Sequence, residues 1–223
     1  MIHTGNTQVF CTASVDENVP SWMKEKNRAA EKLGLPKAGW ITAEYSMLPR
    51  ATHTRNKRDR EKVSGRTQEI QRLIGRALRA MIDLEKLGER QIIVDCDVIQ
   101  ADGGTRTASI TGACIAVGLA LSKLVKDGKV PAGVFTDTVQ AISVGMFDGE
   151  VLVDLDYEED ASCDVDMNFV RTGAGLFVEI QGTAEKKAFS EADLKKMMAG
   201  ALGGLNKLRD KQVEVLRAHL PIT

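Results

Sequence analysis

The chain has very few histidines, and that scarcity excludes several kinds of active site. Its 223 residues include only His3, His53 and His219, which lie near the two ends and in a basic segment. None of them stands in a spacing typical of a hydrolase triad or of a zinc site. The nucleotide-binding motifs G-x-x-x-x-G-K-[ST] and G-x-G-x-x-G are also absent. Chemistry in this protein therefore depends on arginine, backbone amides and carboxylates.

The chain also lacks a charge excess and any paired cysteines. Its 30 Lys and Arg residues are balanced by 31 Asp and Glu residues, so affinity for nucleic acid has to come from local patches of positive charge. Cys11, Cys96, Cys114 and Cys163 show no metal-binding or redox spacing, which predicts buried free thiols in a reducing compartment. No apolar run approaches membrane-spanning length and no signal-peptide pattern opens the chain. We therefore expect a soluble, cytoplasmic protein with no membrane partner.

Hydrophobic periodicity predicts an α+β fold over residues 1–223, taken as a single domain. Hairpins and helical stretches come in groups, which favours a mixed or antiparallel sheet packed with helices. Asp148-Gly149 marks the clearest hairpin turn, and Ser64 and Ser190 are candidate helix caps. The expected strands are 7–15, 40–48, 91–98, 141–147, 151–156, 164–170 and 176–181, and the expected helices are 24–33, 64–88, 105–126 and a last one from 190.

The stretch 97–112 is the most informative part of the chain. A strand leads into Gly103 and Gly104, which let the backbone turn sharply and leave no side chain over the turn. Thr105 and Arg106 then occupy the first turn of a helix, where free N–H groups already favour an anion. The stretch predicts a binding site for a small tetrahedral anion such as phosphate. An ordinary strand-to-helix turn with an exposed arginine fits the spacing equally well.

The segment 154–166 is strongly acidic. It holds no Lys or Arg, and strand-like sequence flanks it on both sides. Oxygen-only clusters of this kind suit Mg²⁺ or Mn²⁺, which take one or two carboxylates and otherwise bind water and substrate phosphate. A solvated acidic loop is the competing interpretation. Combined with the predicted anion site, the segment favours phosphoryl or nucleotidyl transfer. Its acids are Asp154, Asp156, Glu158, Glu159, Asp160, Asp164 and Asp166.

Five motifs, by their length and order, are specific to one family. They are AEYSMLPRAT at 43–52, SGRTQEIQRLIG at 64–75, DCDVIQADGGTRTASITG at 95–112, LDYEED at 155–160 and VDMN at 165–168. They closely resemble the bacterial ribonuclease PH family, and the resemblance runs from about Gly5 to near the C-terminus. It implies a ribosomal protein S5 domain 2-like fold. It also implies a phosphate-dependent 3′→5′ exoribonuclease, a nucleotidyltransferase that trims the 3′ ends of tRNA precursors and of rRNA and releases nucleoside diphosphates.

The resemblance implies phosphate-binding roles for four residues. Arg66 matches the family's phosphate-binding arginine, while Gly104, Thr105 and Arg106 match its phosphate-binding turn. Inorganic phosphate is then the co-substrate that attacks the last phosphodiester. The position of Arg66 favours this role independently, because a cation in the first turn of a helix opposes the helix dipole unless an anion lies nearby.

Two further groups of residues match functional positions of the family. Asp160 and Asp166 match the two catalytic, metal-associated aspartates, which with Mg²⁺ or Mn²⁺ offset charge on the reacting phosphate and relay a proton to the departing 3′-hydroxyl. Arg50, Arg55 and Arg58 match arginines of a loop that grips tRNA. The implied partners are tRNA precursors and other RNA 3′ ends, and the implied assembly is a ring-shaped homohexamer, a trimer of dimers.

The beginning of the chain departs from the family pattern. Members usually begin earlier and include the first strand of a hairpin, so we expect residues 1–3 to stand where that strand ends. The strand at 7–15 would then have an exposed edge. Two alternatives stay open: a non-catalytic RNA-binding ring subunit, and an inactive truncated fragment that cannot assemble. Retention of Arg66, Arg106, Asp160 and Asp166 argues against the first alternative.

Overall fold

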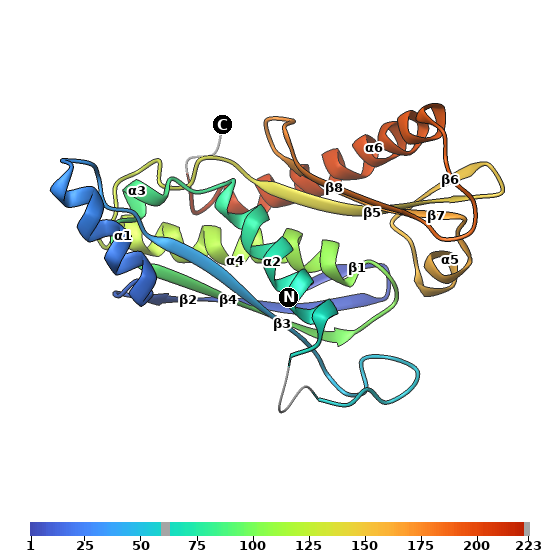
Figure 1. Ribbon diagram of the computed structural model, residues 1–223, viewed down its shortest axis with the longest axis horizontal. Helices are drawn as coiled ribbons and strands as arrows, with labels where there is room; N and C mark the ends of the chain where they lie inside the picture. The colour runs from blue at the N-terminus through green and yellow to red at the C-terminus, as the bar shows by residue number, and fades with distance from the viewer. Residues whose placement is uncertain (59–62, 221–223) are drawn as a thin grey trace.

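Two four-stranded sheets form the framework of the protein, whose computed structural model describes residues 1–58 and 63–220 (Figure 1). The first sheet has the order β1-β2-β4-β3 and consists of β1 (Ile2–Thr4), β2 (Thr7–Asp16), β3 (Trp40–Met47) and β4 (Gln91–Gln100). The second has the order β6-β5-β7-β8 and consists of β5 (Val139–Phe147), β6 (Glu150–Val153), β7 (Val165–Thr172) and β8 (Phe177–Ala184).

The α+β prediction is confirmed, and each sheet follows one of the two expected patterns. The first sheet is mixed, because β3 runs parallel to β4 while β1 and β2 are antiparallel to their neighbours. The second sheet is antiparallel throughout. Its β5–β6 hairpin turns at Asp148 and Gly149, both with positive φ, as the Asp-Gly pair predicted.

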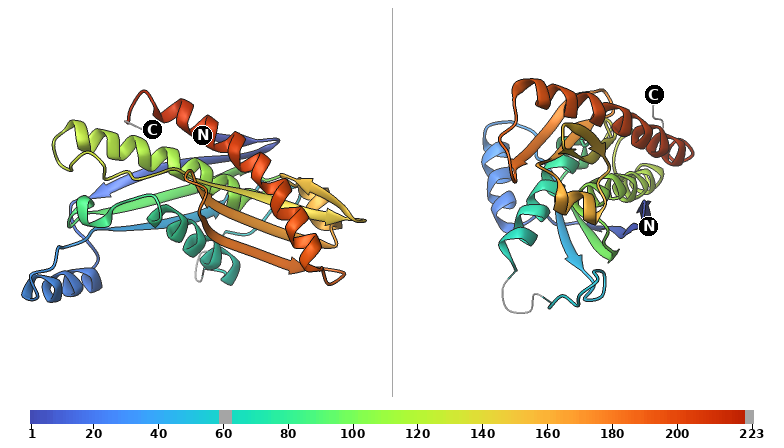
Figure 2. Two further views of the ribbon diagram at one scale, coloured as in Figure 1. Left: turned by 90° about the horizontal axis from the view of Figure 1, so that it is seen from above. Right: turned by 90° about the vertical axis from the view of Figure 1, so that its right-hand side faces the viewer.

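The helices lie between the sheets and along their outer sides. They are α1 (Ser21–Lys32), α2 (Gly65–Arg79), α3 (Leu84–Leu87), α4 (Thr105–Lys126), α5 (Tyr157–Ser162) and α6 (Glu191–Leu216). Helix α4 packs against β2 of the first sheet and β5 of the second, and it crosses the middle of the view in Figure 1. Figure 2 shows α4 beside α6, which also contacts it. Helix α2 packs on β3, and α6 packs on β5 and β6. Figure 1 shows α1 at one end of the long axis and α5 at the other.

One hydrophobic core joins the two sheets. Its largest cluster combines buried residues of the first sheet, α2 and α4 with Val139, Ala141 and Val170 of the second sheet. Small residues on α4 make this close packing possible. A Cβ added at Gly112 would lie 2.7 Å from Ile2 Cγ2, and one added at Gly118 would lie 2.7 Å from Leu216 Cδ2. The expected central helix 105–126 is therefore confirmed, with the same bounds as α4.

The expectation that no apolar run approaches membrane-spanning length is wrong. Helix α4 has 22 residues and a mean hydropathy of 1.8 in its most apolar window, so by length and composition alone it could cross a membrane. That window is 67% buried inside the protein. The apolar surface of α4 therefore packs against the sheets and α6.

The predicted helix 64–88 is in fact two helices. Ser64 caps α2 as expected, but α2 ends at Arg79, and Gly88 ends the separate short helix α3. Between them Ile82 forms an isolated β-bridge with Phe135, and Asp83 caps α3. The apolar spacing continues through this break because Met81 and Ile82 are buried in a non-helical turn. Spacing alone did not separate these two arrangements.

A short strand precedes β2 and forms a hairpin with it. Residues Ile2 to Thr4 form β1, which pairs with β2 from Thr7 to Val9. Residues 1–3 were expected where a preceding strand would end, and this pairing covers the beginning of the β2 edge. Within the described residues, the stretch of β2 after Val9 has a strand neighbour only on the β4 side.

Candidate active site

A cavity of about 960 Å³ brings together most of the site residues predicted from the sequence. Its walls come from the β3–α2 connector, the first turn of α2, the β4–α4 turn, α5 and β7. We call this cavity the cleft. Seven of the nine predicted residues line it: Arg58, Arg66, Gly104, Thr105, Arg106, Asp160 and Asp166. Residues separated by more than 100 positions in the sequence thus meet at one place.

The glycine turn has the geometry that its sequence predicted. Gly103 and Gly104 have φ of +70° and +51°, a region that favours glycine. Gly104 is the N-cap of α4 and supplies no side-chain cap, so the first-turn amides face the cleft without one. A Cβ at Gly103 would collide with the backbone of Leu155 and Asp156. The turn therefore packs directly against the acidic segment.

Thr105 is held in place by a residue to which the sequence analysis gave no functional role. Its Oγ1 lies 2.8 Å from the hydroxyl of Tyr45 on β3, and both side chains are buried. Burial raises the pKa of Tyr45, and the nearby charges of Arg66 and Arg106 oppose that rise. Buried residues alternate along β3, so Tyr45 lies on the same buried face as Ile41 and Ala43. Such alternation does not show which group the Tyr45 hydroxyl contacts.

Arg106 reaches the cleft from the first turn of α4 and is steadied by two partners. Its Nη1 lies 3.4 Å from Glu69 Oε2 and donates to Gln181 Oε1 at 3.2 Å. Gln181 in turn donates to Glu69 at 2.9 Å. The partners come from α2 and β8, so elements associated with different sheets orient one guanidinium. Arg66 lies in the first turn of α2 and is exposed to the cleft.

The two predicted catalytic aspartates line the cleft from α5 and β7. We call this side the acidic wall, and the side formed by Arg66, Arg106 and the glycine turn the arginine wall. Asp160 is exposed on α5, and Asp166 is half-buried on β7. Burial raises the pKa of Asp166, and repulsion from Asp160 raises it further, whereas Arg106 and Arg66 oppose the rise. These interactions place both carboxylates and both arginines within electrostatic range of one another.

The acidic segment is not a loop throughout, as one interpretation had it. Residues Tyr157 to Ser162 form α5, which opens with a capping box: Asp156 accepts from the Glu159 amide at 2.9 Å, and Glu159 accepts from the Asp156 amide at 3.1 Å. Acids in the first turn of a helix also suit its dipole. Two carboxylates of the cluster are thus structural. The spacing D-x-x-E was the signal that could have revealed them.

The donor set fits a hydrated divalent cation. Within residues 1–58 and 63–220, no group of three or more His, Cys, Asp and Glu residues could hold a metal ion. Mg²⁺ in particular is commonly bound by one or two carboxylates, with water and substrate phosphate filling the other positions. Asp160 and Asp166 offer two such carboxylates, and their mutual repulsion, which raises the pKa of Asp166, is what a cation would relieve.

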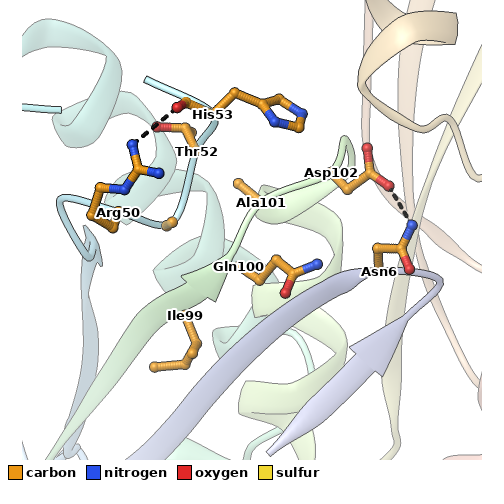
Figure 3. A pocket seen from close by; sticks show the side chains of 9 residues that line it. Asn6, Arg50, Thr52, His53, Ile99, Gln100, Ala101 and Asp102 are labelled. Carbon is orange, nitrogen blue, oxygen red and sulfur yellow. Dashed lines mark hydrogen bonds between the residues drawn. The ribbon is translucent and has the colours of Figure 1, made fainter. Parts of the chain in front are cut away.

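The three connector arginines are not gathered at one point. Arg58 lines the cleft, and Arg55 is exposed and lines neither described cavity. Arg50 lines a second cavity of about 370 Å³ and donates to the backbone oxygen of His53 at 3.0 Å (Figure 3). The two cavities share His53 among their lining residues, so the second continues the cleft along the connector.

Comparison with known proteins finds one family. The model of the 3′ exoribonuclease family matches in both of its parts, domain 1 over residues 1–122 and domain 2 over residues 137–204. Ribonuclease PH of Bacillus subtilis (strain 168) is 54% identical over 224 residues, which cover 99% of this chain and 87% of that protein. Ribonuclease PH of Bacillus velezensis is 55% identical with the same coverage.

Two solved structures share the fold. Rice (Oryza sativa) Rrp46 matches with a TM-score of 0.72 and 16% identity, covering 96% of this chain and 86% of that one. The exosome of Archaeoglobus fulgidus with RNA bound to its active site matches with a TM-score of 0.72 and 20% identity, covering 94% and 80%. At these identities the likeness concerns the fold.

Proposed function

The chain belongs to the 3′ exoribonuclease family, and we propose that the cleft is the place where it performs phosphorolysis. Its identity of 54–55% to two ribonuclease PH proteins over 99% of the chain makes it a phosphate-dependent 3′→5′ exoribonuclease that acts on tRNA. This activity is a nucleotidyl transfer to inorganic phosphate. The roles of individual residues in the cleft are also our proposal.

Inorganic phosphate binds at the arginine wall. Arg66 and Arg106 contribute charge-assisted hydrogen bonds, and the first-turn amides of α4 after Gly104 contribute neutral ones. Thr105 adds a hydroxyl whose direction is set by Tyr45. Three features of different origin support this placement: two arginines on two helices, a glycine turn without a side-chain cap, and a buried hydroxyl pair.

The reaction exchanges one P–O bond for another. An oxygen of the bound phosphate forms a bond to the last phosphorus of the RNA, and the bond from that phosphorus to the preceding 3′ oxygen breaks. The terminal nucleotide leaves as a nucleoside diphosphate, and the 3′ oxygen of the shortened RNA takes up a proton. Asp166 is suited to relay that proton, because it lines the cleft and its raised pKa makes its carboxylate a better proton acceptor than an ordinary aspartate. Mg²⁺ or Mn²⁺, when bound by Asp160 and Asp166, supplies positive charge to the reacting phosphate.

The RNA approaches along the connector, and the 3′ ends of tRNA precursors and of rRNA are its substrates. Arg58 at the cleft and Arg50 at the adjoining cavity lie where RNA phosphates upstream of the 3′ end would pass. Arg55 is exposed and can contact RNA farther out. We place the protein in a homohexameric ring, a trimer of dimers, in the cytoplasm. The fold shared with an archaeal exosome core supports a ring, and four free cysteines suit a reducing compartment.

The convergence of seven predicted residues on one cleft carries this proposal. The test is to incubate the protein with a tRNA that bears a 3′ extension, with and without inorganic phosphate and Mg²⁺, and to separate the released nucleotides. We expect nucleoside diphosphates, and only when phosphate is present. Nucleoside monophosphates released without phosphate would instead indicate hydrolysis. RNA binding without any release would favour the non-catalytic ring subunit.

A further inference from the structure

Asp102 lies between β4 and the glycine turn, and its backbone is fixed by a buried threonine. The Asp102 amide donates to Thr7 Oγ1 at 2.8 Å, and Thr7 Oγ1 donates to the backbone oxygen of Gly103 at 2.7 Å. Thr7 is 1% exposed at the start of β2. The residue that precedes the glycine turn is thus attached to the first sheet.

The side chain of Asp102 bonds to two other segments, one on each carboxylate oxygen. Oδ2 accepts from Asn6 Nδ2 at 2.9 Å, in the β1–β2 turn (Figure 3). Oδ1 accepts from the backbone amide of Tyr157 at 3.1 Å. The same two bonds lower the pKa of Asp102, against the effect of burial. At neutral pH both bonds are therefore made by a charged carboxylate.

Tyr157 is the first residue of α5, and α5 is a short helix that needs such partners. A helix of six residues is too short to be stable by itself, and its first amides have no partner within the helix. Asp156, the residue directly before the helix, accepts a hydrogen bond from the Glu159 amide. Asp102 satisfies the Tyr157 amide from 55 positions away in the chain. The hydrogen bond from the Tyr157 amide to Asp102 therefore caps α5 and also joins α5 to the glycine turn.

The position of this bond relates it to the reacting groups. Arg106 lies four residues after Asp102, just across the glycine turn, and Asp160 lies three residues after Tyr157, about one helical turn along α5. The close approach of Gly103 to Leu155 and Asp156 adds a second contact between the same two segments. A change at Asp102 should alter the separation between the phosphate-binding turn and Asp160.

We propose that Asp102 is a positioning residue that sets the distance between the phosphate-binding turn and the aspartate on α5. It touches neither phosphate nor RNA in this role. The inference rests on the proposed function, because it assigns phosphate to the turn and catalysis to Asp160. Catalytic groups need placement to within a fraction of an ångström, and a misplacement of about 1 Å can cost on the order of 100-fold in rate.

Three variants separate positioning from general stability. Asp102→Ala removes both acceptors. Asp102→Asn keeps the shape, because its amide oxygen accepts from Tyr157 and its NH₂ donates to Asn6 once the Asn6 amide is rotated. Asp83→Ala is the matched control: Asp83 also accepts from two helix amides, those of Glu85 and Lys86 at 3.1 Å, but it caps α3 and does not line the cleft.

The first measurement is steady-state phosphorolysis, with kcat, the KM for phosphate and the affinity for RNA determined separately. For Asp102→Ala we expect kcat to fall by about 10- to 100-fold while RNA affinity changes less than about twofold. Asp102→Asn should recover kcat to within a few-fold of the wild type. Asp83→Ala should lower the melting temperature as Asp102→Ala does and keep the wild-type kcat.

The second measurement is amide hydrogen exchange over α5, which needs no activity. Asp102→Ala should speed exchange at the Tyr157 amide and through α5, and Asp102→Asn should restore its protection. Normal kcat in Asp102→Ala, or a loss confined to RNA affinity, overturns the inference. So does unchanged exchange in α5. If the wild type fails to release nucleoside diphosphates, the proposed function fails, while the exchange data still decide whether Asp102 holds α5.

Discussion

The two walls of the cleft differ in how they hold their charge. On the arginine wall, Arg106 already has neutral and acidic partners in Gln181 and Glu69. On the acidic wall, Asp160 repels Asp166, and burial raises the pKa of Asp166 as well. The arginine wall is therefore oriented before substrate binds. The acidic wall carries repelling negative charges, and binding a cation or a proton would reduce that repulsion.

The walls also come from different halves of the chain. Domain 1 of the family model covers residues 1–122 and includes the arginine wall, whereas domain 2 covers 137–204 and includes both aspartates. Neither half holds a complete site. We have proposed that phosphate binding belongs to the arginine wall and catalysis to the acidic wall, so variants on each wall should fail in different ways.

The largest loss of activity is expected from substitutions on the acidic wall. Asp160→Asn or Asp166→Asn removes a proton relay and metal ligand, so kcat should fall by about 10²- to 10⁴-fold with little change in the KM for phosphate. The measurement is release of nucleoside diphosphates from an extended tRNA at saturating phosphate. A double variant that retains near-normal phosphorolysis would remove the catalytic role from this wall.

The stability of Asp166→Asn serves as the folding control. A folded-state pKa raised above the unfolded value, which is about 4, means that ionised Asp166 destabilises the fold. That destabilisation is fully present above the folded pKa and disappears as the pH falls below the unfolded value. Asp166→Asn should therefore raise the melting temperature at neutral pH and not at acidic pH. Burial also raises the pKa of Asp154, so Asp154→Asn should raise the melting temperature at neutral pH in the same way.

A smaller and different defect is expected on the arginine wall. Arg66→Ala and Arg106→Ala each remove a charge-assisted hydrogen bond worth about 1.5–3 kcal/mol, so the KM for phosphate should rise by about one to two orders of magnitude. RNA affinity should change little. Arg106→Lys should recover only part of the loss, because lysine lacks the planar fork that Glu69 and Gln181 orient. A fall in RNA affinity at unchanged phosphate KM would show that these arginines bind RNA instead.

The smallest effect on phosphorolysis is expected from substitutions in the β3–α2 connector, which lies outside both walls. Changing Arg50, Arg55 and Arg58 together to Ala should weaken tRNA binding and flatten the dependence of log affinity on log salt. Each RNA phosphate that an arginine no longer binds should reduce that slope by about 0.7. Of the single variants, Arg58→Ala should be the most damaging, because only Arg58 lines the cleft. Phosphorolysis of a very short oligonucleotide should stay normal. An unchanged salt slope in the triple variant would make these residues a solvated surface.

The arginine wall was largely predictable from the sequence, because its signals are local. The Gly103-Gly104 pair determined the turn, and Thr105 was correctly expected to begin the helix. Arg66 was correctly placed in the first turn of α2 after the Ser64 cap. In each case the residues that determine the backbone conformation are neighbours in the chain, so short-range rules were sufficient.

The acidic wall and the supports of both walls were harder to predict. Helix α5 was missed because six residues show no helical period, and its start depends on Asp102, which is distant in sequence. The roles of Tyr45, Glu69 and Gln181 also depend on side chains that meet only after the sheets are packed. Periodicity places a residue on a face and does not show which atoms it will meet.

The core that joins the two sheets has a consequence for synthesis of the protein. The strands of the first sheet end at Gln100, yet their inner face packs in one cluster with Val139, Ala141 and Val170. A nascent chain that has emerged only to the start of α4 can pair its first strands before α4 covers β2 and β4, and before β5 and α6 in turn cover α4. Transiently exposed apolar surface of this kind promotes aggregation, so we expect this ribosome-bound intermediate to be the most aggregation-prone stage of folding. Because β5 and α6 are synthesised after the first sheet and α4, slow translation of the second half of the chain would lengthen the time for which this apolar surface is exposed.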